Sequence, residues 1–272
     1  MSKTQKELAF LRDLSVEPEW TARFTETFDK SYEFTDEESV LYVNAGAGNH
    51  VLALREKLKD EVEIFGVTEN EELTQIAQAK AKAVKADVGF SSLIPPEHFD
   101  LVIADASFVP PDQLPVFLKE TVGLAENRVV FFLPTRGSFG EVFSMLWEVC
   151  LSEDLIERSG AVEDLITGIP TVSEVEEMAQ SAGLKQLKSN TTIEVFEFED
   201  GEEFVNSVLV ADFLLPVWFG FLRQEEKEEV RKKLSRTIDE NRDSLSFRFT
   251  VKATIFGGKK GLKVKGFKSE KV

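Results

Sequence analysis

The chain has 272 residues, 42% hydrophobic and 30% charged, enough for one large α/β domain whose core needs no covalent staple. A single cysteine, Cys150, excludes an internal disulfide, and with two histidines it forms no cluster at the spacing of zinc ligands, so we expect no metal. The net charge of −17 disfavours a long nucleic-acid groove, because an acidic surface repels the phosphate backbone.

Residues 1–38 predict an N-terminal helical extension that covers the main fold. Apolar residues recur there at helical spacing in two runs separated by Pro18, namely Leu8, Leu11 and Leu14, then Trp20, Phe24 and Phe28. The segment carries charges at short intervals and has no apolar run of signal-peptide length. We therefore expect a cytoplasmic protein.

Apolar strands and helices alternate in the first half of the main region, residues 39–258. The expected strands are 40–43, 61–67, 83–88, 99–108 and 127–134, with helices at 50–58, 69–83, 111–122 and 138–150. Strands that alternate with helices in this way predict a parallel sheet with right-handed crossovers.

The second half of this region has a different rhythm. Thr171 and Glu174 form a capping box that opens a helix. Two late strands, 183–200 and 244–257, flank a helical insertion or lid at 201–242. We expect these two strands to form an antiparallel pair at the edge of the sheet.

These elements together predict an α/β fold. The expected architecture is a seven-stranded, mostly parallel, doubly wound sheet with an antiparallel C-terminal strand pair, an N-terminal helical cover and the helical insertion. A basic tail, 259–272, follows, and we interpret it as a solvated chain end.

Residues 208–222 form an apolar segment within the insertion. It is too short, and too interrupted by Asp212 and Pro216, to span a bilayer. The expected role is a lid over a ligand pocket or plain core, because ligand sites are mostly apolar and partly roofed. The alternative is a surface for a protein partner or for a second copy of the chain.

The turn after the first strand, residues 44–50, is the predicted ligand site. Ligands of parallel sheets bind beyond the carboxyl ends of the strands, at the switch point beside the first strand. Gly46 and Gly48 let the backbone approach a ligand closely, and the next helix offers unpaired N–H groups, which favours a nucleotide or nucleoside. Val51 stands where a dinucleotide fingerprint needs a third glycine, so NAD is disfavoured.

A series of stretches, in order along the chain, carries a family resemblance: VLYVNAGAGNHVLAL, FGVTENEELTQIAQAKA, FDLVIADASF, NRVVFFLPTRG, TVSEVEEMAQSAGLKQL and SFRFTVKATIFGGKKG. The first is similar to motif I of the class I (Rossmann-like) S-adenosylmethionine-dependent methyltransferases, and the second to their second-strand motif. The others resemble strands four and five, the helix before strand six, and strand seven. The resemblance covers about residues 39–258 and implies S-adenosylmethionine as the cofactor.

Several positions depart from the family pattern. Tyr42 stands where the family has an acid that holds the methionine part of the cofactor, and Asn44 replaces the first motif glycine. Thr68 stands where an acid binds the ribose hydroxyls, with Glu69 one residue later as its possible substitute.

The resemblance implies that other positions contact the cofactor, and Asn49 could compensate for the missing acids. Four of them lie in the turn itself: Ala45, Gly46, Gly48 and Asn49. Asp87, after the third expected strand, matches the acid that contacts the adenine amino group, with Val88 beside the ring. Asp105 lies where members place residues that contact the cofactor or the acceptor, and its alternative role is to cap the following loop.

Two functions are compatible with these residues. The first is methyl transfer to a small acceptor, apolar or cationic because of the Phe-rich roof and the acidic body, with Asp164 and the loop 168–171 at the border of the acceptor site. The second is a catalytically inactive methyltransferase-like protein that serves as a binding or scaffold module. The departures at Tyr42, Asn44 and Thr68 favour the second.

Overall fold

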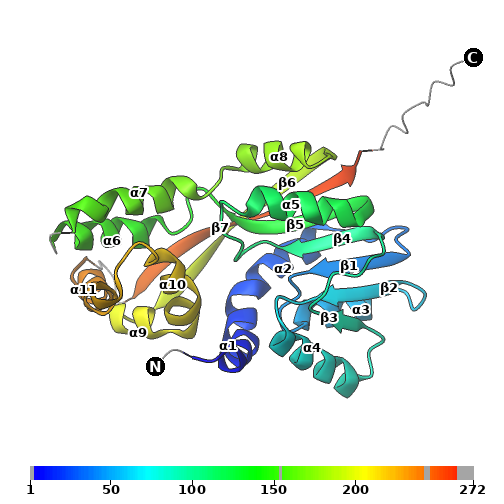
Figure 1. Cartoon of the computed structure of the whole chain (residues 1–272), viewed down its shortest axis with the longest axis horizontal. Coiled ribbons are helices and arrows are strands. Elements are labelled where there is room, and N and C mark those ends of the chain that lie inside the picture. Colours follow the sequence, from blue (N-terminus) through cyan, green and yellow to red (C-terminus); the bar gives the residue numbers. More distant parts are fainter. Residues whose placement is uncertain (1–2, 153–154, 242–245, 262–272) are drawn as a thin grey trace, which may run out of the picture.

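The computed structural model describes residues 3–152, 155–241 and 246–261, and shows one sheet with helices on both faces (Figure 1). The strands are β1 Ser39–Val43, β2 Glu63–Val67, β3 Gly89–Ser91, β4 Phe99–Asp105, β5 Ala125–Thr135, β6 Leu184–Phe198 and β7 Phe247–Lys260. Their order in space is β3-β2-β1-β4-β5-β7-β6. Strands β1 to β5 pair in parallel, and β7 runs antiparallel to both β5 and β6. The predicted fold class is confirmed.

Helices connect most of the strands. They are α1 Gln5–Leu11, α2 Ala22–Ser31, α3 Asn49–Lys57, α4 Glu71–Val84, α5 Leu114–Leu124, α6 Gly140–Ser152, α7 Ser159–Gly168, α8 Val172–Ser181, α9 Gly201–Asn206, α10 Leu215–Trp218 and α11 Gln224–Asn241. Three segments have other helical forms, the π-helical η1 Arg12–Thr21 and η3 Leu209–Leu214 and the 3₁₀ turn η2 Ile156–Arg158. The predicted capping box opens α8. The insertion, α9 to α11, lies with α6 and α7 beyond one end of the sheet, at the left of Figure 1.

Side chains of the central strand β1 point alternately into two apolar cores, one on each face of the sheet. Val40 and Tyr42 belong to the core that includes residues of η1, α2, α3, α6 and the insertion. Leu41 and Val43 belong to the other core, together with residues of α5 and α8. A strand buried on both faces needs a continuous apolar run, which explains why β1 is recognisable in the sequence.

The third strand lies later in the chain than predicted. We expected it at 83–88, but α4 continues to Val84 and is capped by Lys85, whose φ of 54° is left-handed. Val84 is exposed and Val88 is only partly buried, whereas Phe90 in β3 is buried beside Gly48. Burial of Phe90 therefore decides where the strand forms.

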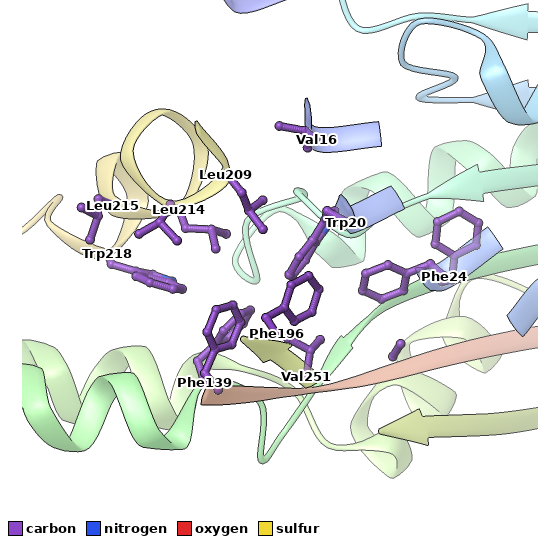
Figure 2. Packing of buried hydrophobic residues seen from close by; sticks show 14 of the residues in the cluster. Val16, Trp20, Phe24, Phe139, Phe196, Leu209, Leu214, Leu215, Trp218 and Val251 are labelled. Carbon is purple, nitrogen blue, oxygen red and sulfur yellow. The ribbon is translucent and has the colours of Figure 1, made fainter. Parts of the chain in front are cut away.

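The N-terminal helices α1, η1 and α2 follow one another without a break and are integral to the core. Trp20 is fully buried, and its ring lies 5.3 to 6.0 Å from the rings of Phe24, Phe108, Phe139 and Phe196. Figure 2 shows Trp20 above Phe196, with Leu209 of the insertion on one side and Phe24 on the other. The predicted helical cover is thus confirmed, and it bridges the sheet and the insertion.

The apolar segment 208–222 forms η3 and α10 and lies mostly inside the molecule. Its buried side chains are Leu209, Val210, Leu214, Leu215, Trp218, Phe219 and Leu222. Figure 2 labels four of them, Leu209, Leu214, Leu215 and Trp218. These side chains belong to the core rather than to an exposed face. Within the described ranges, no helix is both long enough and apolar enough to cross a membrane.

Replacing Trp20 by alanine is expected to lower the free energy of unfolding by about 3–5 kcal/mol, because the core cannot refill the cavity. Leu14→Ala in the same helical cover, where the side chain is 71% exposed, is the control and should change it by less than about 0.5 kcal/mol. Urea unfolding followed by far-UV circular dichroism measures both. Equally small losses in the two variants would show that the N-terminal helices are not part of the cooperative core.

Candidate functional site

The turn between β1 and α3 is built from left-handed residues. Asn44, Gly46 and Gly48 have φ values of 56°, 56° and 82°. At Gly48 an added Cβ would lie 2.9 Å from side-chain atoms of both Ala77 and Phe90, so no larger residue fits. The backbone N–H groups of the turn, at the N-terminus of α3, form a site that favours anions.

Two carboxylates of the chain itself occupy this anion site. Glu17 of η1 accepts a hydrogen bond from the N–H of Ala47, and a Cβ on Gly46 would overlap the same carboxylate oxygen. Glu69, which follows β2, accepts a hydrogen bond from the N–H of Gly46 at 3.1 Å. Burial raises the pKa of Glu17 to about 7, although the Ala47 N–H and the charge of Arg12 oppose the shift.

A buried guanidinium lies beside these carboxylates. Nη2 of Arg12 is 3.2 Å from Oε1 of Glu69 and 3.9 Å from Oδ2 of Asp105. Its Cζ lies 4.4 Å from the centre of the Phe108 ring. Opposite charges and an aromatic face both stabilise a buried cation. Arg12 therefore joins the ends of β2 and β4 to the N-terminal helix.

Asp105 ends β4, is buried, and has one oxygen already satisfied. Its Oδ1 accepts a hydrogen bond from the N–H of Ser107 at 2.8 Å, which is the loop-capping role expected as an alternative. Among the described residues, neither Oδ2 of Asp105 nor Nε of Arg12 has a hydrogen-bond partner. Burial raises the pKa of Asp105 to about 6, and Arg12 opposes the shift. Buried polar atoms without partners are uncommon, and a catalytic role is one of the explanations for them.

Two adjoining cavities lie at this end of the sheet. The larger has a volume of about 590 Å³, lies between the N-terminal helix, the ends of β1 and β4, and α5, and is lined by residues that include Arg12, Asn44, Glu69, Asp105 and Phe117. The smaller has a volume of about 130 Å³ and a mostly apolar lining that includes Trp20, Phe139, Phe143, Leu165 and Trp218. The two share Phe108, Val109, Pro110 and Phe213 in their walls.

Part of the predicted site comes together at the larger cavity. Three predicted side chains line it: Asn44, Glu69 and Asp105. Nδ2 of Asn44 donates a hydrogen bond to the backbone carbonyl of Asp105 at 2.9 Å, which ties the end of β1 to the end of β4. Three other predicted residues form the turn beside it: Ala45, Gly46 and Gly48.

Three other predicted side chains are engaged elsewhere. The hydroxyl of buried Tyr42 lies 3.0 Å from Nδ1 of His50. Thr68 donates a hydrogen bond to a backbone carbonyl at the start of α4, and Asn49 accepts one from Lys80 at 2.6 Å. Of the described residues that line the larger cavity, none is one of these three.

Asp87 and Val88 lie before β3 rather than after it, which corrects their predicted place. The carboxyl end of β3 is Ser91, paired with Val67 of β2. Asp87 is exposed, and Val88 packs against the core. The shift of the strand thus moves both residues to its amino end, and Ser92 is the first residue beyond it.

The loop 168–171 borders the smaller cavity, as expected for a border of an acceptor site. Ile169 and Pro170 line that cavity. Asp164 is exposed, and it is not among the described residues of the lining.

Arg12 and Glu17 are missed by the sequence analysis, because charged residues on a helix are expected to be solvated. A signal exists nevertheless. Arg12 interrupts the apolar stripe formed by Ala9, Val16 and Trp20, so a charge occupies a position that faces the core. In the π-helical η1, hydrogen bonds run between residues five apart, and this brings Arg12 and Glu17 to the same side.

No protein-family model matches the sequence, and no curated protein matches it. Solved structures do match. The YcgJ protein from Bacillus subtilis has a TM-score of 0.54 at 15% identity, over 89% of this chain and 100% of that one. A putative methyltransferase from Bacillus halodurans C-125 has a TM-score of 0.52 at 12% identity, over 89% and 100%. Phosphoethanolamine N-methyltransferase 2 from Haemonchus contortus, in complex with phosphomonomethylethanolamine and S-adenosylhomocysteine, has a TM-score of 0.53 at 10% identity, over 96% and 59%.

The chain therefore has the fold of the class I S-adenosylmethionine-dependent methyltransferases. At these identities the likeness concerns the fold and leaves the chemistry to be argued from the site.

Glu17→Gln is expected to stabilise the protein at pH 8 and much less at pH 5.5. The folded-state pKa of Glu17, about 7, exceeds its ordinary value of 4.5, so its contribution to stability is present at low pH and is lost as the pH rises through about 7. Glutamine keeps an acceptor for the Ala47 N–H without a charge. The gain in the free energy of unfolding should therefore be larger at pH 8 than at pH 5.5 by about 2 kcal/mol.

Urea unfolding at the two pH values measures the gain, with Glu26→Gln at an exposed position of α2 as the control. A gain for Glu17→Gln that does not change with pH would contradict the buried, charged state of Glu17.

Proposed function

We propose that this protein transfers a methyl group from S-adenosylmethionine to a small acceptor that is apolar or cationic. The observation that carries the proposal is the pair of adjoining cavities at the carboxyl ends of β1 and β4, where ligands bind in doubly wound sheets. A reaction between two bound molecules needs two compartments in contact. The methyltransferase fold is compatible with this function.

The larger cavity fits the adenosyl part of the cofactor. Phe108 and Phe117 offer apolar walls for a flat base. Nε of Arg12 is a donor, buried and without a hydrogen-bond partner among the described residues. Glu69 adds an acceptor for hydroxyl groups. These residues would hold the nucleoside.

The amino-acid part of the cofactor has fewer groups left to bind it. The N–H groups of Gly46 and Ala47, which would otherwise receive its carboxylate, already donate to Glu69 and Glu17. The larger cavity therefore offers partners for the nucleoside, whereas these two N–H groups are not free for the tail while η1 is in place.

The smaller cavity suits an apolar acceptor. When bound, the cofactor supplies a methyl group on a positively charged sulfur, so the chain has mainly to align an acceptor and exclude water. Of the described residues that line this cavity, none is charged, and Nε1 of Trp20 is satisfied by Oγ of Ser107 at 3.0 Å. Its aromatic rings also accept a cationic group.

Asp105 is the residue that we assign to proton removal from the acceptor. With a pKa of about 6 it is ionised at pH 8, and its Oδ2 has no hydrogen-bond partner among the described residues. Asp105 lines the larger cavity, and Ala106 and Ser107, which follow it, line the smaller one. A carboxylate at this boundary can accept a proton from a hydroxyl or ammonium group.

The second candidate function is a catalytically inactive binding or scaffold module. The observation that favours it is the pair of turn N–H groups already bound to Glu17 and Glu69. Tyr42 and Thr68 favour it too, because their side chains form hydrogen bonds with other groups of the chain and do not line the larger cavity.

Cofactor binding is tested by calorimetric titration with S-adenosylhomocysteine, with NAD as the control ligand. Phe108→Ala is expected to weaken binding by about tenfold, because Phe108 forms a wall of both cavities. Leu93→Ala, at a side chain that is 76% exposed and outside the lining, should bind as the wild type does. No binding at millimolar ligand by the folded protein would overturn the proposal.

Catalysis is tested by transfer from radiolabelled S-adenosylmethionine to a panel of small phenols and amines. Asp105→Asn is expected to lower kcat by about 100-fold with a smaller effect on the KM of the acceptor, because general bases contribute about this factor. Cofactor binding without transfer to any acceptor would favour the inactive module instead.

A further inference from the structure

The Glu17 carboxylate is an anion held inside the chain's own anion site. Glu17 is 5% exposed, and its partner, the Ala47 N–H, lies in a turn whose residue Gly46 has no space for a Cβ beside that carboxylate. A backbone N–H donates one strong hydrogen bond. A ligand carboxylate and Glu17 therefore cannot use this donor at the same time.

Arg12 excludes the positive charge of a ligand from the same site. Its guanidinium lies against Glu69, Asp105 and the face of Phe108, which is the arrangement that a ligand cation would seek. An ammonium or sulfonium group placed there would meet the charge of Arg12. The N-terminal helix thus supplies both a carboxylate and a cation at the end of β1, the two charges of an amino acid.

The space that remains suits a ligand without those charges. The cavity of about 590 Å³ beside the turn is lined by the Glu69 carboxylate, by Arg12, whose buried Nε has no hydrogen-bond partner among the described residues, and by the apolar walls of Phe108 and Phe117. One acceptor and one donor between apolar walls match the polar edge of a neutral nucleoside.

We propose that Glu17 determines the ligand specificity of this site: with η1 seated, the site takes a neutral 5′-thioadenosine and excludes nucleosides that carry an amino-acid tail. Binding of S-adenosylmethionine requires residues 5–17 to move away from the turn. This inference rests on the proposed function, because it assumes that the larger cavity holds the adenosyl group.

A movement of residues 5–17 away from the turn would have to break both polar and apolar contacts. In α1 the buried residue is Ala9, whereas Trp20 and Phe24 anchor the end of η1 and the start of α2 in the core. Glu17 with Ala47 and Asp13 with Lys80 are polar contacts of η1 with the turn and with α4. The apolar contacts are those of Ala9 with Ala47 and Leu73, and of Val16 in the main core. Movement of residues 5–17 therefore has to expose Ala9 and Val16 as well as break the polar contacts.

The test compares two ligands in three proteins. The proteins are the wild type, Glu17→Ala and the control Glu19→Ala, which changes an exposed position of η1. Each is titrated by calorimetry with 5′-deoxy-5′-methylthioadenosine and with S-adenosylhomocysteine. Wild type and Glu19→Ala are expected to bind methylthioadenosine at least about tenfold more tightly than S-adenosylhomocysteine. Glu17→Ala should gain at least about tenfold for S-adenosylhomocysteine, the value of one hydrogen bond to a charged group, and less than about threefold for methylthioadenosine.

Glu17→Gln covers the case in which Glu17→Ala fails to fold. Glutamine keeps the hydrogen bond to Ala47 but not the charge, so its gain for S-adenosylhomocysteine should be smaller than that of Glu17→Ala and still selective for the tailed ligand. Hydrogen exchange of the peptide that contains Gly46 and Ala47 gives a readout without ligand, and Glu17→Ala should speed it while Glu19→Ala does not.

The outcomes separate the two proposals. If S-adenosylhomocysteine binds wild type as tightly as methylthioadenosine does, and removal of Glu17 gives no gain, Glu17 does not set specificity while the proposed function stands. If neither nucleoside binds to any of the folded proteins, the proposed function fails and the inference fails with it.

Discussion

The burial of Trp20 decides where the N-terminal helix lies, and the candidate site depends on that position. Its ring packs against Phe108 after β4, Phe139 before α6 and Phe196 in β6. The preceding turns of the same helix carry Arg12 and Glu17 to the ends of the central strands. Burial of a charge is unfavourable unless the charge is paired, so the apolar anchor and the polar cluster stabilise one arrangement together.

The order of strands and helices is predictable from the sequence because buried parallel strands require apolar runs, while the short β3 is misplaced because only Phe90 marks it. Asn44, Glu69 and Asp105 are predictable in the same way, since each lies at the carboxyl end of a strand or within two residues of it. Glu17 lies 30 residues before Ala47 in the sequence. It reaches the turn because η1, which carries it, packs against the ends of the strands. Periodicity reports which face of a helix is buried and does not report what that face touches.

Three carboxylates surround one guanidinium at the ends of β1, β2 and β4. When all three are ionised, Glu17, Glu69 and Asp105 exceed the single charge of Arg12, and burial reduces this excess by raising the pKa of Glu17 to about 7 and that of Asp105 to about 6, which favours their neutral forms. The charge of the cluster therefore changes within the range of ordinary cellular pH. A neutral ligand is less sensitive to this change than a zwitterion is.

Glu17 and the N–H group that it contacts belong to one chain, so Glu17 acts as an intramolecular competitor. Its effective concentration is set by the helix that carries it, and dilution of the protein does not alter it. The apparent dissociation constant of a tailed ligand equals its intrinsic value divided by the fraction of molecules in which η1 has left the turn. Any interaction that holds residues 5–17 away from the turn would therefore raise the affinity for such ligands, and it would also move Arg12 out of the wall of the larger cavity.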